Sequence, residues 1–251
     1  MKILLIVTVE NSVRNVNLIE NNYNKLKNVD EISWAFNHFD GKNDLWKEKN
    51  WYNNLNCIKN VEIGSKITQW KKITPKISRF YDYLWFLDGD MGLEKFNWKE
   101  YYKMLVRSKP ILSQPGILPS EPGGRASDFS YLCLKDKNKD KIFSLPNIKY
   151  CDIENQTPFI STKIWYLLFE KIQVTDARAD WEICSFMNKI TKDLNGKRLV
   201  NFKSPCVHHD FRNYQDIKSL DTRREYFQSP DPIDYDDKIS KIKKIIYNKL
   251  N

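Results

Sequence analysis

The sequence lacks the cysteine spacing of a disulfide framework or a zinc site. Its five cysteines are an odd number, and no two of them form a C-x-x-C pair. Reduced thiols are typical of cytosolic proteins, so we expect a cytoplasmic location.

Long hydrophobic runs are also missing. No apolar stretch approaches the length of about 20 residues that a membrane-spanning helix needs. The apolar residues near the amino terminus, residues 3–9, lack the longer core and the small-residue cleavage site of a signal peptide, and they predict a buried strand instead. We therefore expect a soluble protein with neither a signal peptide nor a membrane anchor.

A motif that interleaves basic and aromatic residues, as nucleic-acid-binding proteins have, is absent as well. The net charge of +9 comes from residues scattered along the chain, with only a mild concentration of lysines in residues 238–249. This pattern favours a solvated, lysine-rich surface and no nucleic-acid partner, and it leaves the oligomeric state open. At 41% hydrophobic and 14% aromatic, the chain has enough apolar residues for a core.

The most informative feature that is present is an apolar strand that ends in two acids. Residues 83–87 are followed by Asp88-Gly89-Asp90, and open α/β sheets bind ligands at the carboxyl ends of their strands. Crowded carboxylates repel each other unless a cation or a shared proton neutralises them, so the motif predicts a hard divalent cation that holds a diphosphate. In this interpretation Asp90 binds the metal directly, Asp88 binds it through water or holds a ribose, and Gly89 lets the diphosphate approach the backbone. The alternative is a turn that ends the strand, where Asp and Gly are common.

Hydrophobic periodicity divides the first half of the chain into alternating strands and helices. Strands are expected at residues 2–9, 31–36, 57–63, 83–87 and 110–114, and helices at 12–28, 65–79 and 97–107, with a restart at Pro75 and a polar loop at 37–56. This alternation predicts an α/β fold with a mostly parallel central sheet flanked by helices.

The second half is more irregular. It contains a turn-rich segment at 115–124, expected strands at 131–134, 148–153 and 199–207, and expected helices at 162–171, 180–190 and 236–249. Asp152, Glu154 and Gln156 alternate along the chain and share one face, which is either solvent or a polar pocket.

Asp180 stands at the expected start of a helix and has two interpretations. It can be the helix N-cap, or it can be a general base that takes the proton of an attacking hydroxyl, because a carboxylate held at a helix start is well aimed. Glu182 is the second candidate for the base.

Two of the three histidines stand together at the end of the last expected strand. A neutral imidazole beside Asp90 would complete a metal site with diphosphate oxygens and water. His208 and His209 point to opposite faces if the chain is still extended, so only one of them is expected to be a ligand, and we choose His208. A purely structural role for both is the alternative.

These segments, in this order, resemble a glycosyltransferase of the GT-A fold and, more specifically, an uncharacterised plant family of lumenal glycosyltransferases. The matching segments are residues 87–97, 111–115, 153–161, 174–176 with 179–180, and 206–208. The set, without an anchor, is also similar to what we expect of a glycosyltransferase encoded by a large algal virus. The chain departs from the family at Gly89, where an acid is common, and at residues 177–179, where the family is Gly- and Trp-rich. The second departure concerns the assignment of the base.

The resemblance implies a metal-dependent, inverting hexosyl- or pentosyltransferase. It would move a sugar from a nucleoside-diphosphate-sugar, most simply a UDP-sugar, to a hydroxyl of a glycan acceptor, with Mn²⁺ or Mg²⁺ as cofactor. We expect one GT-A domain over residues 1–251, with a Rossmann-like nucleotide-sugar-binding half at 1–110, an acceptor and catalytic half at 111–215, and a helical tail at 216–251.

The same interpretation assigns the site residues. The donor site comprises Val7, Thr8, Val9, Asn37, Asp40, Asp88, Gly89 and Asp90; the acceptor site comprises Gln114, Glu154 and Trp181; the metal ligands are Asp90, His208 and, through water, Asp88; and the base is Asp180, with Glu182 as the alternative.

Two other functions stay open. An apolar strand that ends in Asp-x-Asp also marks haloacid-dehalogenase-type phosphohydrolases, with Asp88 as nucleophile. That motif usually lies near the amino terminus and is followed by Thr or Val where this chain has Gly92, and the acids at 236–237 are not a convincing partner pair. A non-catalytic protein that binds carbohydrate or nucleic acid would use the aromatic residues and the positive charge, but it leaves the acids at the strand ends unexplained.

Overall fold

The computed structural model describes residues 1–120, 148–149, 153, 155–172 and 179–209 of the 251-residue chain. Met1–His209 form one compact unit. Its strands are β1 (Ile3–Val9), β2 (Ile32–His38), β3 (Ile58–Val61), β4 (Tyr83–Asp88), β5 (Met91–Gly92), β6 (Leu112–Pro119), β7 (Ile148–Lys149), β8 (Phe159–Ser161) and β9 (Arg198–His208). Its helices are α1 (Val13–Leu26), α2 (Asp44–Lys47), α3 (Asn50–Asn54), α4 (Lys66–Lys71), α5 (Pro75–Ser78), α6 (Trp98–Ser108), α9 (Thr162–Lys171) and α10 (Ala179–Asp193).

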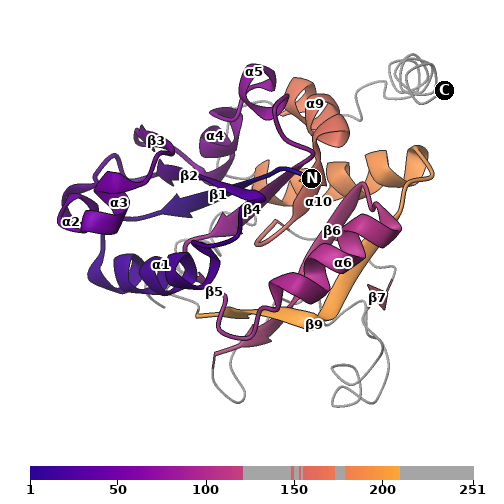
Figure 1. Ribbon diagram of the computed structural model, residues 1–251. Helices are drawn as coiled ribbons and strands as arrows, with labels where there is room; N and C mark the ends of the chain where they lie inside the picture. The colour runs from indigo at the N-terminus through magenta and orange to yellow at the C-terminus, as the bar shows by residue number, and fades with distance from the viewer. Residues whose placement is uncertain (121–147, 150–152, 154, 173–178, 210–251) are drawn as a thin grey trace. The chain divides into compact units, whose positions relative to one another are not determined.

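The described strands form one nine-stranded sheet in the order β3-β2-β1-β4-β8-β6-β9-β5, with β7 paired to β9 (Figure 1). Strands β1, β2, β3, β4, β6 and β9 run in one direction, and β5, β7 and β8 run in the other. The prediction of an α/β fold with a mostly parallel sheet is therefore confirmed.

Helices cover both faces of the sheet because the residues of the central strands alternate between two hydrophobic clusters. On β1, Ile3, Leu5, Val7 and Val9 pack in the cluster that contains α1, α2, α3 and α6. Leu4 and Ile6 pack in the other, which contains α4, α9 and α10. This period of two places the core on both sides of a buried strand, as expected for an α/β sheet.

Several local signals have the expected structural effect. Asn97 is the N-cap of α6, and its side chain accepts a hydrogen bond from the amide of Glu100. The expected helix at 65–79 is divided into α4 and α5, because Pro75 restarts it as a first-turn residue. The polar segment 37–56 contains the short helices α2 and α3.

The structure corrects the prediction at three strands. The expected strand at 110–114 continues through Pro115 and Gly116 to Pro119, because it pairs with β9 beyond the expected turn. Strands β5 and β8 were not predicted, since two or three residues carry no periodicity. The expected strand at 131–134 and the tail helix at 236–249 lie outside the described residues, and the division into donor half, acceptor half and tail stays a prediction.

Strand β9 has a bulge that changes its register against β6. Pro115 pairs with Asn201 and Ile117 with Cys206, so residues 202–205 lie opposite Gly116 alone. A Cβ atom on Gly116 would lie 2.9 Å from the ring of Phe202, which leaves little room for any larger residue there.

An aromatic cluster encloses one buried histidine at the end of β2. The ring of His38 makes edge contacts with Trp46 and Tyr52, and its Nε2 lies 2.8 Å from the Tyr52 hydroxyl. Burial lowers the pKa of His38 to about 4 and raises the pKa of Tyr52 to about 12. The folded protein therefore holds this pair in its neutral form at pH 7.

The depressed pKa of His38 predicts a loss of stability in mild acid. The free energy of unfolding should be at its full value above the ordinary pKa of 6.5 and should fall as the pH decreases through the window from 6.5 to about 4. The loss attributable to His38 reaches about 2 kcal/mol by pH 5. Urea unfolding of the protein and of His38→Gln at pH 7, 6 and 5 measures this loss. If the free energy of unfolding falls equally with pH in both proteins, the prediction is wrong.

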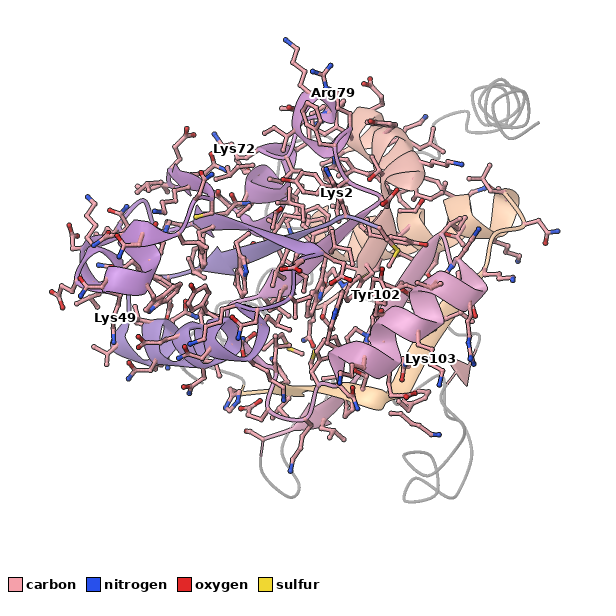
Figure 2. All side chains as sticks on the ribbon, viewed as in Figure 1. Lys2, Lys49, Lys72, Arg79, Tyr102 and Lys103 are labelled. Atoms are coloured by element: carbon pink, nitrogen blue, oxygen red, sulfur yellow. The ribbon has the colours of Figure 1, made fainter. Side chains whose placement is uncertain are left out.

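The surface agrees with the expected solvated lysine-rich character. Figure 2 shows exposed basic side chains such as Arg79 and Lys103 that reach away from the ribbon. Among the described residues, no helix combines the length and the apolar character needed to cross a bilayer.

Candidate functional site

Asp88 and Asp90 lie at the carboxyl end of β4, one of the parallel strands. Asp88 is the last residue of β4, and its amide donates to the carbonyl of Gln156 at 2.9 Å. Its Oδ2 accepts a hydrogen bond from Nζ of Lys66, the first residue of α4, at 2.6 Å. Both side chains are mostly buried, so the ion pair lies in a region that water screens only partly.

Asp90 faces the end of β9. The antiparallel pairing of β5 with β9 sets Met91 opposite His208, and the amide of His209 donates to the carbonyl of Asp90 at 2.9 Å. His208 is 3% exposed, and its Nε2 lies 3.2 Å from Oδ2 of Asp90. The second histidine contacts a different acid, since Nε2 of His209 lies 2.6 Å from Oε1 of Glu94.

The donor atoms beside Asp90 suit a divalent cation that keeps part of its water shell. No group of three or more His, Cys, Asp or Glu side chains in the described parts of the chain could hold a metal ion by itself. Asp90 and His208 offer one carboxylate and one imidazole side by side. Mg²⁺ and Mn²⁺ are commonly bound by one or two carboxylates together with water and substrate phosphates, so Asp90 is a suitable ligand. The imidazole of His208 suits a transition-metal ion better than Mg²⁺.

Gly89, between the two acids, has no room for a side chain. A Cβ atom there would lie 2.6 Å from the side-chain nitrogen of Asn15 and 2.6 Å from the carbonyl oxygen of Thr8. The close approach of α1 and β1 is thus a sufficient reason for glycine at this position. The predicted contact of Gly89 with a diphosphate stays a prediction.

The expected donor residues of β1 differ in what they can offer. Val7 and Val9 are fully buried in the core, so they can contribute main-chain groups only. Thr8 is 8% exposed and pairs with Asp88 in the register of β1 and β4. Of the three, only Thr8 brings a polar side chain to the neighbourhood of Asp88.

The two expected donor residues after β2 are both bound within the protein. Asn37 is fully buried; its amide nitrogen donates to the carbonyl of Gln69, and its amide oxygen accepts from Asn60. Asp40 accepts hydrogen bonds from the amides of Asn11 and Lys42. These bonds connect the ends of β1, β2 and β3 with α4, which supports the rim of the site.

The expected acceptor and catalytic residues are described only in part. Gln114 is fully buried on β6, where it pairs with Val200 of β9. Glu154 lies outside the described residues. The backbone of residues 180–182 belongs to α10, but their side-chain positions are outside the described part of the structure. Because α10 already includes Ala179, Asp180 lies within the helix and is not its N-cap.

Three polar residues around the acids were not predicted from the sequence. Lys66 pairs with Asp88, and Asn15 and Asn22 donate to the main chain on either side of Asp90. A signal for the asparagines was present, because both stand on the face of an amphipathic helix that is otherwise apolar. Nothing local distinguishes Lys66 from the many other lysines.

Comparison with solved structures identifies the fold. S. aureus TarS matches with a TM-score of 0.53 and 15% identity over 83% of this chain and 37% of that one. A shorter TarS chain, residues 1–349 in complex with UDP-GlcNAc, matches with a TM-score of 0.56 and 14% identity over 85% of this chain and 60% of that one. GalNAc-T7 with UDP, GalNAc and Mn²⁺ matches with a TM-score of 0.56 and 13% identity over 83% and 44%. At these identities the likeness shows the fold alone, and that fold is GT-A.

Family membership comes from the sequence itself. No curated protein matches the chain. The family described as "Protein of unknown function (DUF707)" matches residues 1–197, which is well over half of the chain. The protein therefore belongs to the DUF707 family.

Proposed function

We propose that this DUF707 protein is a metal-dependent, inverting glycosyltransferase with a nucleoside-diphosphate-sugar donor, most simply a UDP-sugar. The observation that carries the proposal is the pair of acids at the end of β4, with Asp90 3.2 Å from His208 of β9, in a sheet of the GT-A fold. One solved structure with this fold is a complex with UDP-GlcNAc, and another contains UDP with Mn²⁺, which supports a donor and a cation of this kind here.

In the proposal, Asp90 and His208 would hold Mn²⁺ or Mg²⁺, and Asp88 would bind it through water. When bound, the cation neutralises negative charge on the diphosphate and makes it a better leaving group. Lys66, which donates to Asp88, would supply a second positive charge for the same phosphates. Thr8 and, at the rim, Asp40 would contact the nucleoside, and the buried Asn37 would support them from below.

The transfer itself requires a base on the acceptor side. The oxygen of the acceptor hydroxyl attacks the anomeric carbon, the bond from that carbon to the diphosphate breaks with its electron pair on the leaving oxygen, and Asp180 takes the hydroxyl proton. Gln114, Glu154 and Trp181 would shape the acceptor site, with Glu182 as the alternative base. A general base of this kind contributes about 100- to 10,000-fold in rate.

Donor binding should raise the melting temperature only when a divalent cation is present. At a concentration of about 100 times its Kd, a bound donor adds about 2.7 kcal/mol to the free energy of unfolding. For a chain of this size, that corresponds to a rise of roughly 5–10 °C. Thermal-shift measurement with a panel of nucleotide sugars in Mn²⁺, and again in EDTA, tests this, followed by release of nucleoside diphosphate with an acceptor panel.

Other outcomes would point to the other functions. Release of inorganic phosphate with covalent capture of Asp88 by a phosphate mimic would favour a phosphohydrolase. Steeply salt-dependent binding of nucleic acid, without any nucleotide-sugar binding, would favour a non-catalytic binding protein. Either result would overturn the proposal.

A further inference from the structure

Helix α1 carries two buried asparagines on its core-facing side. Asn15 is 3% exposed and Asn22 is 2% exposed, and they lie about two helical turns apart on one face. Their neighbours on that face, such as Val16 and Ile19, belong to the hydrophobic core. A buried amide in such surroundings is costly unless its hydrogen bonds are made, so the partners of these two side chains are informative.

Both partners lie in the segment that follows β4. Nδ2 of Asn15 donates to the carbonyl of Gly89 at 2.7 Å. Nδ2 of Asn22 donates to the carbonyl of Met91 at 2.8 Å, and its Oδ1 accepts from the amide of Leu93 at 2.8 Å. Asn22 thus gives β5 the bonds that a neighbouring strand would otherwise supply. Oδ1 of Asn15 accepts from the amide of Glu10, which ties the same side chain to the end of β1.

The carbonyl of Asp90, which lies between those of Gly89 and Met91, is bound on the opposite side. Asp90 accepts a hydrogen bond from the amide of His209 on the β9 side, while Gly89 and Met91 are bound on the α1 side. The carbonyls of residues 89–91 are therefore bound alternately to α1 and to β9, across the turn at 89–90 that joins β4 to β5. This alternation sets the orientation of the peptide on each side of Asp90, and with it the direction of the Asp90 side chain toward His208.

The glycine at position 89 explains why its carbonyl needs the hydrogen bond from Asn15 and why Asn15 can come close enough to make it. Gly89 can adopt many backbone conformations, so the peptide that joins it to Asp90 would turn easily without a bond to its carbonyl. The side-chain nitrogen of Asn15 occupies the space that a Cβ atom on Gly89 would need. Asn15 therefore replaces the steric restraint that a side chain at position 89 would give.

We infer that Asn15 and Asn22 are positioning residues, which hold the backbone of residues 89–93 so that the Asp90 carboxylate faces His208. Both side chains are bonded to the main chain, so they would act on the cation through Asp90. The expected effect on cation binding rests on the proposed function, because a displaced Asp90 weakens cation binding only if Asp90 is a ligand. Side chains that orient metal ligands typically change metal affinity or activity by about 10- to 100-fold when they are replaced.

Hydrogen exchange and cation binding together test the inference. The variants are Asn15→Leu and Asn22→Leu, which remove the bonds at similar volume, with Asn15→Ser and Asn22→Ser as smaller polar versions should the first pair fail to fold. Asn97→Ala is the matched control, because it removes an asparagine hydrogen bond at the start of α6 instead. Exchange is followed by mass spectrometry without ligand, and Mn²⁺ affinity is measured by electron paramagnetic resonance with UDP present.

The expected result is faster exchange confined to peptides that cover residues 88–93 and 206–209, with Mn²⁺ binding weakened by about tenfold or more. Asn97→Ala should change neither quantity. Unchanged exchange at 88–93 in a folded variant would overturn the inference, as would faster exchange with unchanged Mn²⁺ affinity. If the unsubstituted protein binds neither Mn²⁺ nor UDP, the proposed function fails, and exchange alone then decides whether the asparagines hold this segment.

Discussion

Replacement of Asp90 by alanine should lower the rate of Mn²⁺-dependent sugar transfer by about 100- to 1000-fold, the range seen when one group that stabilises developing charge is removed. Asp90 is one of two side chains that we assign as direct cation ligands, and the other, His208, would remain without its partner at 3.2 Å. The change is measured as release of nucleoside diphosphate over a range of Mn²⁺ concentrations. Part of the lost rate should return at high Mn²⁺, since affinity for the cation is what the variant loses.

The ion pair of Glu94 with His209 provides a control for this experiment. Glu94 contacts His209 at 2.6 Å, and its side chain is 44% exposed. Glu94→Gln therefore removes the carboxylate that contacts the histidine next to His208, without changing an assigned ligand. Its rate should stay within about twofold of the unsubstituted protein, as for an exposed ion pair. Full activity of Asp90→Ala, or an equal loss in both variants, would rule out Asp90 as the specific cation ligand.

Asp180→Asn should have the second large effect, a fall of about 100- to 10,000-fold in kcat. Asparagine has the shape of aspartate but cannot take the proton of the acceptor hydroxyl at neutral pH. Donor binding in Mn²⁺, measured by thermal shift, should be unchanged, because the base acts on the acceptor. A loss of kcat without a change in donor affinity would separate catalysis from folding.

Glu182→Gln is the matched variant for Asp180→Asn. Both positions belong to the first part of α10, which packs against α4, α9 and β6. If Glu182→Gln loses activity and Asp180→Asn keeps it, the base is Glu182. If both variants transfer sugar at the normal rate, neither carboxylate is the base, and the assignment of the base to the start of α10 is wrong.

The central strands and their helices could be predicted from the sequence because they depend on local patterns. The continuous runs of apolar residues in β1 and β4 are visible in any short window. Pro75 and Asn97 act on their own helices, so their effects also follow from the sequence alone. The position of Asp88 at a strand end was predictable for the same reason.

The rest depends on pairing between distant segments. Strand β8 has three residues and exists because β4 and β6 lie on either side of it. Strand β5 has two residues and is held by β9 and by Asn22 of α1. Such short strands have no periodicity of their own, and only the assembled sheet selects them.

The candidate site likewise has one contact that the sequence predicted and one that it did not. The contact between Asp90 and His208 was expected, since both acid and histidine stand at strand ends that meet at one edge of a sheet. The ion pair of Asp88 with Lys66 was not expected, because it requires the start of α4 to lie beside the end of β4. Lysine is so abundant in the sequence that a mostly buried one does not stand out.

The bulge in β9 has a consequence for how many residues the chain can gain or lose before His208. Leu199 and Cys206 pack in the same hydrophobic cluster, whereas in a regular strand an odd separation would send them to opposite faces. The bulge at 202–205 reverses the alternation once, and it thereby turns His208 to the side on which Asp90 lies. Deletion or insertion of a single residue there would turn the imidazole away, while a change of two would preserve its direction. The face on which His208 lies thus depends on whether the number of residues in the bulge is odd or even.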